Sequence, residues 1–201
     1  MATRMTTTSY ALLGLIGLRP SSTYELAKQV ERSLGWFWPR TERKTYDQAK
    51  RLVEAGYATA SSGTTGARPR TMYKITPKGR RALRAWLGEP SAPPKLESEA
   101  QVRVFFADAG DLDQLNSTLT QIGDEAHRKI DVLRDLIAGA NDPDYEYAQR
   151  THLNAVSIRF QLDYQRMTAE WADWAREQTD QWAAIDDPGP WEWRREIELS
   201  D

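Results

Sequence analysis

The sequence contains no cysteine and only two histidines, His127 and His152. Without cysteine it has no disulfide framework, no thiolate nucleophile and no Cys-based zinc site, which suits a reducing compartment. The two histidines fall in different predicted helices, and neither belongs to an H-E-x-x-H motif. We therefore expect packed or solvated histidines, no bound metal and no cofactor.

Long apolar runs are also missing. No stretch approaches the roughly 18 apolar residues of a membrane span, and the first ten residues, MATRMTTTSY, lack the apolar segment of a leader. There is no nucleophile elbow or dinucleotide fingerprint. The paired carboxylates Asp186 and Asp187 lie in a predicted flexible segment, where they are not preorganised as acid and base. We therefore expect a cytoplasmic protein that is not membrane-bound and not an enzyme.

Charge of the two signs is unevenly distributed. Residues 1–88 hold 16 Lys and Arg against 5 Asp and Glu, whereas residues 89–201 hold 11 against 24. A hydrophobic content of 40% is enough for a folded core. Because phosphate binding depends on Lys and Arg, the asymmetry predicts a basic part that meets a polyanion and an acidic part that stays off it. A chance split of surface charge is the alternative.

Two short helices are predicted at the start of the basic part. Residues 7–18 are apolar on almost all sides, which predicts a buried helix. Ser22 and Glu25 form a capping box that begins the second helix, and Gly35 ends it. The aromatic turn at residues 36–39, Trp-Phe-Trp-Pro, is predicted to be a hydrophobic plug joining two helices.

A third helix is predicted over residues 42–55, with Thr41 as its N-cap and Gly56 after its end. Its buried stripe is Tyr46, Ala49, Leu52 and Val53. Charged residues gather on the opposite face, with Gln48 at the margin: Arg43, Lys44, Asp47, Lys50 and Arg51.

A hairpin and a fourth helix follow. Residues 57–60 and 71–75 are predicted strands, and the Gly-containing loop from residue 61 to 66 is a hairpin tip, because it leads into a strand where a phosphate-binding loop would open a helix. Thr76 and Pro77 begin the next helix. The proline-rich residues 88–94 mark the domain boundary.

Three helices are predicted beyond the boundary, at residues 97–109, 111–137 and 142–184. The second has coiled-coil-like spacing, which indicates a partner helix packed along it. The third is too long for a small monomeric core to cover, which indicates a dimer seam along its apolar stripe. That stripe is Leu153, Val156, Phe160, Met167, Trp171 and Trp174. The tail, residues 185–201, has no predicted role.

Three helices followed by a hairpin form a winged helix-turn-helix, whose third helix fits the major groove of DNA. Side chains on that helix can read bases, and the candidates are Arg43, Lys44, Gln48 and Arg51; Lys50 is better placed for phosphate. Asp47 either accepts from cytosine or holds a neighbouring arginine. In the wing, Arg68 and Arg70 suit a narrow minor groove or flanking phosphates equally.

The chain resembles the PadR family of bacterial transcriptional regulators, in the long form with an extended C-terminal helical domain. The motifs are YALLGLI, SSTYELAKQVE, TYDQAKRLVEAGYAT and RTMYKITPKGRRAL, in this order. Where the family often has a Ser/Pro-Gly-Thr-Leu-Tyr-like entry to the recognition helix, this chain has Glu42-Arg43-Lys44-Thr45-Tyr46. Thr45 and Tyr46 complete the predicted set of DNA contacts.

The resemblance implies a homodimeric repressor that binds double-stranded DNA at a pseudo-palindromic operator and is released by a small aromatic or phenolic effector. Six aromatic residues are candidates for an effector pocket, with dimer core as the alternative: Trp86, Phe105, Phe106, Phe160, Trp171 and Trp174. The expected fold is mainly α, with a winged helix-turn-helix at residues 5–88 and a helical dimerisation domain at 95–184. A protein-interaction module that uses the acidic helices without specific DNA binding is the alternative function.

Overall fold

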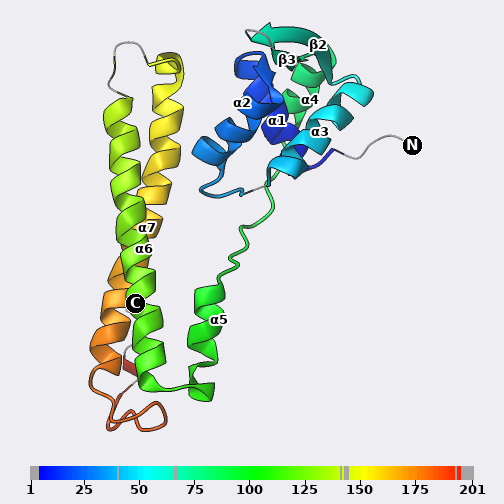
Figure 1. Ribbon diagram of the computed structural model, residues 1–201. Coiled ribbons are helices and arrows are strands. Elements are labelled where there is room, and N and C mark those ends of the chain that lie inside the picture. The colour runs from blue at the N-terminus through cyan, green and yellow to red at the C-terminus, as the bar shows by residue number, and fades with distance from the viewer. Residues whose placement is uncertain are drawn as a thin grey trace. The chain divides into compact units, whose positions relative to one another are not determined.

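The computed structural model describes residues 5–39, 41–65, 68–140, 142, 145–192 and 194–195. The chain divides into two compact units, Met1–Pro94 and Lys95–Asp201. Within the described residues, no helix is both long and apolar enough to cross a membrane. Each unit has its own architecture (Figure 1).

The first unit contains the three predicted helices, a small sheet and a fourth helix. Its elements are α1 (Thr7–Leu18), β1 (Ser21–Ser22), α2 (Thr23–Gln29), the π-helical turn η1 (Val30–Leu34), α3 (Glu42–Glu54), β2 (Ala58–Thr65), β3 (Arg68–Ile75) and α4 (Pro77–Leu87). Side-chain caps fix where these helices begin, because the first backbone N–H groups of a helix have no partner within it. Thr41 Oγ1 accepts from Lys44 N at the start of α3, and Thr76 Oγ1 accepts from Gly79 N at the start of α4.

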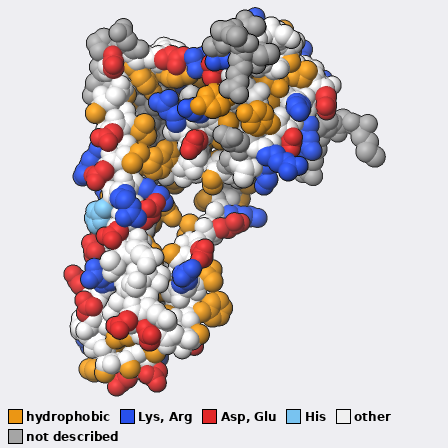
Figure 2. Space-filling view, viewed as in Figure 1, with side chains coloured by type: hydrophobic (Ala, Val, Ile, Leu, Met, Phe, Trp, Pro, Cys, Tyr) orange, Lys and Arg blue, Asp and Glu red, His pale blue; other side chains and the backbone are white. Residues whose placement is uncertain are grey.

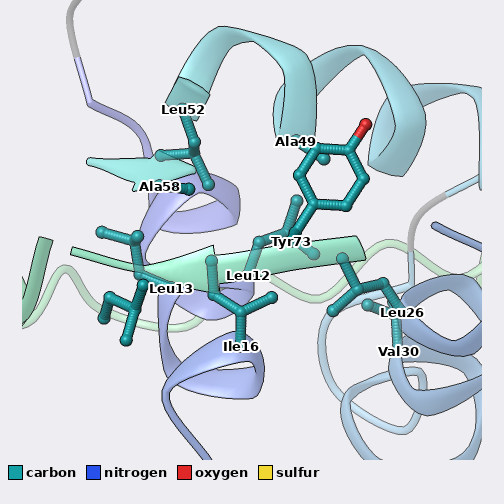
Figure 3. Close-up of a cluster of buried hydrophobic side chains, with 10 residues drawn as sticks. Leu12, Leu13, Ile16, Leu26, Val30, Ala49, Leu52, Ala58 and Tyr73 are labelled. Atoms are coloured by element: carbon teal, nitrogen blue, oxygen red, sulfur yellow. The ribbon is translucent and has the colours of Figure 1, made fainter. Parts of the chain in front are cut away.

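Helix α1 lies at the centre of this unit. Its Leu12, Leu13 and Ile16 are at most 2% exposed. Figure 3 shows them converging with side chains of α2, α3 and the sheet. The remaining members of this core are Leu26, Val30, Ala49, Leu52, Ala58, Tyr73 and Ile75. A helix that is apolar almost all round is therefore buried, as its sequence indicates.

The sheet is antiparallel with strand order β1-β3-β2. Strands β2 and β3 pair from Ala58 with Ile75 to Thr65 with Arg68, so both extend further toward the tip than the predicted strands at 57–60 and 71–75. Two points of the prediction were wrong: residues 61–65 belong to the ladder, and Ser21 and Ser22 form an unpredicted strand on β3. Ser and Thr repeats lack the apolar alternation by which a half-buried strand is recognised.

The predicted second helix changes type before its end at Gly35. From Val30 the backbone forms a π-helical turn in which Gly35 N–H donates to Val30 O at 2.7 Å. The same region is tied to α1 through the aromatic turn, because Trp38 Nε1 donates to Thr8 Oγ1 at 3.2 Å.

The second unit is helical. Its elements are α5 (Glu99–Phe105), the 3₁₀ turn η2 (Ala107–Ala109), α6 (Leu112–Gly139), the 3₁₀ turn η3 (Ala148–Arg150) and α7 (Thr151–Thr179). Helices α6 and α7 pack side by side and antiparallel (Figure 1): Gly123 of α6 faces Ala172 of α7, and Thr179 Oγ1 donates to Asn116 Oδ1 at 2.6 Å. The coiled-coil-like spacing of α6 was therefore a correct indication of a partner helix.

Two predicted helix ranges in this unit were too long. Helix α7 spans Thr151–Thr179, whereas a helix over 142–184 was predicted. It begins later because the backbone before it forms turns in which an N–H group donates to the carbonyl three residues earlier, as from Tyr145 N to Asp142 O and from Ala148 N to Tyr145 O. Helix α5 ends at Phe105, before a 3₁₀ turn, where residue 109 was predicted. The capping box at Asp111 fixes the start of α6 as predicted.

The residues that follow α7 fold back onto the helix pair. Trp191 Nε1 donates to Gln178 Oε1 at 3.0 Å, and the Trp191 and Trp182 rings lie 5.4 Å apart. Trp182 and Ile185 pack on a core formed by Leu115, Leu119 and Ala175. This part of the tail covers the end of the α6–α7 pair.

Candidate nucleic-acid interface

Helix α3 has one face in the core and one in solvent. Ala49 and Leu52 are each 2% exposed and pack against α1 and α2. The opposite face carries exposed charged side chains, as predicted: Arg43, Lys44, Asp47, Lys50 and Arg51. Figure 2 shows several Lys and Arg side chains over the part of the first unit that contains α3. A surface with this many cations attracts the phosphates of a nucleic acid, because neutralising the phosphate charges releases the counterions condensed on them.

Thr45 does not belong to this surface. Its side chain is 1% exposed, and its hydroxyl donates to Thr41 O at 3.4 Å, one turn back in the helix. The prediction of Thr45 as a DNA contact is corrected, because this residue is buried. The predicted buried stripe consisted of Tyr46, Ala49, Leu52 and Val53, and it did not include Thr45. Tyr46 is half-buried at the edge of the helix.

Gln48 points toward α1. Its Nε2 donates to Ser9 Oγ at 2.8 Å, and Ser9 is fully buried. Gln48 is therefore engaged in the contact between α1 and α3, at the margin of the charged face. Ser9 was not singled out in the sequence, since a serine inside an apolar helix gives no signal of its partner.

The wing is tied to α2 through Arg70. Arg70 Nη1 lies 3.3 Å from Glu25 Oε1, and both side chains are about one-third exposed, at 33% and 29%. The other oxygen of Glu25 accepts from Ser22 N at 2.7 Å, which completes the capping box of α2. The pKa of Glu25 is lowered, chiefly by the hydrogen bonds from Ser22 and additionally by Arg70. The side chain of Arg68 lies outside the described part of the structure.

The side chains proposed for an effector pocket lie in several places. Trp86 of α4 stacks on Tyr10 of α1, with centroids 4.7 Å apart and ring planes 5° apart. Phe105 and Phe106 are exposed and border an open groove along α5 with Leu96 and Val102. Trp171 and Trp174 pack on the core of the second unit, and Phe160 is 65% exposed on α7. The described contacts within each unit do not gather these six side chains into one pocket.

The described helices of the second unit carry side chains of both charge signs. Figure 2 shows side chains of both signs along it, and ion pairs such as Arg128–Glu125 at 2.8 Å and Arg134–Asp131 at 2.9 Å lie within its helices. In the part of the chain that the structure describes, no group of three or more His, Asp or Glu side chains is arranged to hold a metal ion.

Three short helices, the third of which is basic, and a two-stranded wing define a winged helix-turn-helix protein. Residues 12–85 match the model of the PadR-like transcriptional regulator family, and residues 98–180 match the model named virulence activator alpha C-term. The chain belongs to the PadR-like family, with a helical C-terminal domain of that second type. This is a family of transcriptional regulators and not of enzymes, which confirms the resemblance seen in the sequence.

Relatives agree with this assignment. The chain is 26% identical over 138 residues to the probable transcriptional regulator Rv1176c of Mycobacterium tuberculosis, covering 63% of this chain and 73% of that one. It is 27% identical over 125 residues to the negative transcriptional regulator PadR of Bacillus subtilis, covering 57% and 69%. The crystal structure of Bacillus subtilis PadR in complex with operator DNA has the same fold, with a TM-score of 0.73 at 19% identity, over 87% of this chain and all of that one.

Proposed function

We propose that this protein is a sequence-specific DNA-binding repressor that acts as a homodimer in the cytoplasm and is released from its operator by a small aromatic ligand. The observation that carries the proposal is the exposed basic face of α3, opposite a stripe packed in the core. A recognition helix needs this arrangement, because it enters the major groove with one face while the other holds it on the domain.

The basic side chains divide by the contacts open to them. Arg43, Lys44 and Arg51 are exposed on α3, where an arginine or lysine can donate to O6 and N7 of guanine. Lys50 serves the phosphates, and Tyr46 lies at the edge of the helix. In the wing, Arg68 and Arg70 hold the flanking phosphates or the minor groove. Arg70 is paired with Glu25 through Nη1, and a guanidinium has further N–H donors that can contact phosphate.

Repression and homodimer formation are supported by separate observations. The Bacillus subtilis relative is a negative regulator, at 27% identity. On α7, four apolar side chains at helical spacing are more than half exposed: Leu153, Val156, Phe160 and Met167. An apolar stripe of this kind is covered in a dimer, and two-fold symmetry would set two α3 helices in successive major grooves, about 34 Å apart.

The ligand is proposed from a relative. Bacillus subtilis PadR has been crystallised in complex with p-coumaric acid, and that structure matches this chain with a TM-score of 0.69. A planar phenolic acid is therefore the first ligand class to test. The candidate contacts remain the aromatic side chains predicted from the sequence: Trp86, Phe105, Phe106, Phe160, Trp171 and Trp174.

The test is a titration onto the DNA upstream of the protein's own gene, beside a shuffled fragment, at two salt concentrations. Arg51→Ala should lower affinity for the upstream fragment by roughly tenfold to a hundredfold, since a bidentate contact contributes about 1–3 kcal/mol of discrimination between bases. The ratio of the affinities for upstream and shuffled DNA should therefore decrease. Arg84→Ala removes an exposed arginine of α4 instead and should change little. Equal binding of both fragments by the wild-type protein would contradict the proposal.

The same titration with added phenolic acids tests release. A ligand of the proposed class should weaken binding to the upstream fragment in a saturable way. Binding that stays constant across a panel of aromatic acids would remove the effector from the proposal and leave the DNA-binding part intact.

A further inference from the structure

The first turn of α1 forms a polar cluster against the recognition helix. Ser9 is fully buried, and its Oγ accepts from Thr6 N at 2.9 Å and from Gln48 Nε2 at 2.8 Å. Thr6 Oγ1 lies 3.0 Å from the same oxygen. A hydroxyl offers one proton and two acceptor sites, so these three contacts saturate Ser9.

A second contact joins the same turn to the segment before α3. Trp38 Nε1 donates to Thr8 Oγ1 at 3.2 Å. The adjacent residues Thr8 and Ser9 of α1 therefore hold α3 at two places, through the aromatic turn that leads into it and through Gln48 in its middle. We call these five residues, Thr6, Thr8, Ser9, Trp38 and Gln48, the α1 clamp.

The clamp supplies what the apolar contacts of α3 lack. Ala49 and Leu52 bury the helix, but hydrophobic contact is non-directional and tolerates rotation of a helix about its axis. A hydrogen bond of 2.8 Å requires a narrow range of distance and angle. The Gln48–Ser9 bond therefore sets the rotation of α3, and with it the directions in which Arg43, Lys44 and Arg51 project.

The geometry points to Gln48 as a positioning residue of the recognition helix and not as a reader of bases. Reading adenine requires the amide N–H and C=O to be presented together to the edge of one base. The amide nitrogen of Gln48 is instead directed to a fully buried hydroxyl of α1. This inference rests on the proposed DNA-binding function and replaces the base-reading role predicted for Gln48 from the sequence.

The two roles predict different base-preference profiles. Binding sites are selected from a random DNA library with the full-length wild-type protein, Gln48→Ala, Ser9→Ala and the double variant. A positioning role predicts that both single variants flatten the preference at every position read by α3, with affinity for the wild-type site reduced about threefold to tenfold, as expected for one hydrogen bond. The double variant should be no worse than the single variants, because both remove the same bond.

Ser33→Ala is the matched control, because it removes a hydroxyl hydrogen bond of the same unit, from Ser33 Oγ to Gln29 O at 2.6 Å, without touching the clamp. Its profile should equal that of the wild type. Should Ser9→Ala not fold, Gln48→Met keeps the length of the side chain and removes the amide. The inference then predicts flattening at all positions, whereas a base reader predicts loss at one base pair.

The outcomes separate the two levels of the argument. A wild-type protein that selects no sequence would overturn the proposed function together with this inference. A wild-type protein that selects a site, with Ser9→Ala retaining the same profile and Gln48→Ala losing one base pair, would overturn the inference alone.

Discussion

Single residues join the parts of the first unit, and Glu25 joins two of them with one carboxylate. One of its oxygens caps α2 through Ser22 N, and the other holds Arg70 of the wing. The capping box was evident from the sequence, because its two members are three residues apart. The pairing of Glu25 with Arg70 of the wing was not evident from the sequence, because the two residues are 45 positions apart and the sequence contains many other arginines that could pair with Glu25.

Glu25 makes the stability of the first unit depend on pH. The pKa of Glu25 is lower in the folded protein than in the unfolded chain. Between the two pKa values the unfolded chain therefore binds more protons than the folded protein, so the free energy of unfolding decreases as the pH falls from the ordinary pKa of a glutamate through the lower folded pKa. Above that range the stabilisation is fully present.

Thermal denaturation of the full chain between pH 3 and pH 7 checks this expectation. Glu25→Gln should lower the melting temperature at neutral pH and lose part of the acid dependence seen in the wild type. Glu125 of α6 also has a lowered pKa, through Arg128, so the difference between wild type and variant is the informative quantity. Glu31→Gln, at an exposed position of η1, is the control, and an equal change in it would refute the role of Glu25.

At the scale of elements, local signals were sufficient wherever capping and apolar spacing coincide. Helix α1 spans the predicted residues 7–18, and α3 begins at the predicted residue. The errors arise where backbone hydrogen bonding decides without a pattern in the side chains. The Ser- and Thr-rich ladder of the wing and the 3₁₀ turn before α7 are of this kind.

The tail shows the same limit. Pro188, Pro190 and the tryptophans near them have no period, so no structure was predicted from residue 185 on, although Trp191 packs on Trp182 at the end of the helix pair. Aromatic burial of this type depends on contacts that only the folded α6–α7 pair creates.

Substitution of Trp191 measures this packing. Trp191→Ala should destabilise the second unit by roughly 2 kcal/mol, below the 3–5 kcal/mol of a fully buried aromatic residue because the ring is partly exposed. Trp191→Phe keeps an aromatic ring but loses part of the indole and its hydrogen bond to Gln178, so its effect should be smaller than that of Trp191→Ala. Chemical denaturation followed by circular dichroism gives both values, and a Trp191→Ala variant as stable as the wild type would show that the tail does not hold the bundle.

On the scale of the whole molecule, the opposite net charges of residues 1–88 and residues 89–201 predict two parts, and the structure divides into two compact units after Pro94. What the charge could not supply is the assembly. The face that α7 packs against α6 contains Leu162, Ala169 and Ala172, whereas the predicted apolar stripe at Val156 and Phe160 stays exposed.

If that stripe is the dimer seam, a charge placed in it should separate the protomers. Val156→Asp is expected to shift the protein from dimer to monomer in light scattering, because an aspartate in the seam would lose its hydration on association. Ala155→Asp places the same charge at the neighbouring exposed position, about 100° around the helix, and should leave the dimer intact. A wild-type protein that is monomeric at micromolar concentration would contradict the dimer.

In the proposed dimer, paired α3 helices read a two-fold symmetric DNA site. Footprinting of the wild-type protein on the DNA upstream of its gene tests this most directly. Two protected half-sites of related, inverted sequence are expected, separated by one helical turn of about 10 base pairs or a multiple of it. Protection spread evenly along the fragment, with no symmetric site at a concentration that saturates the DNA, would contradict it.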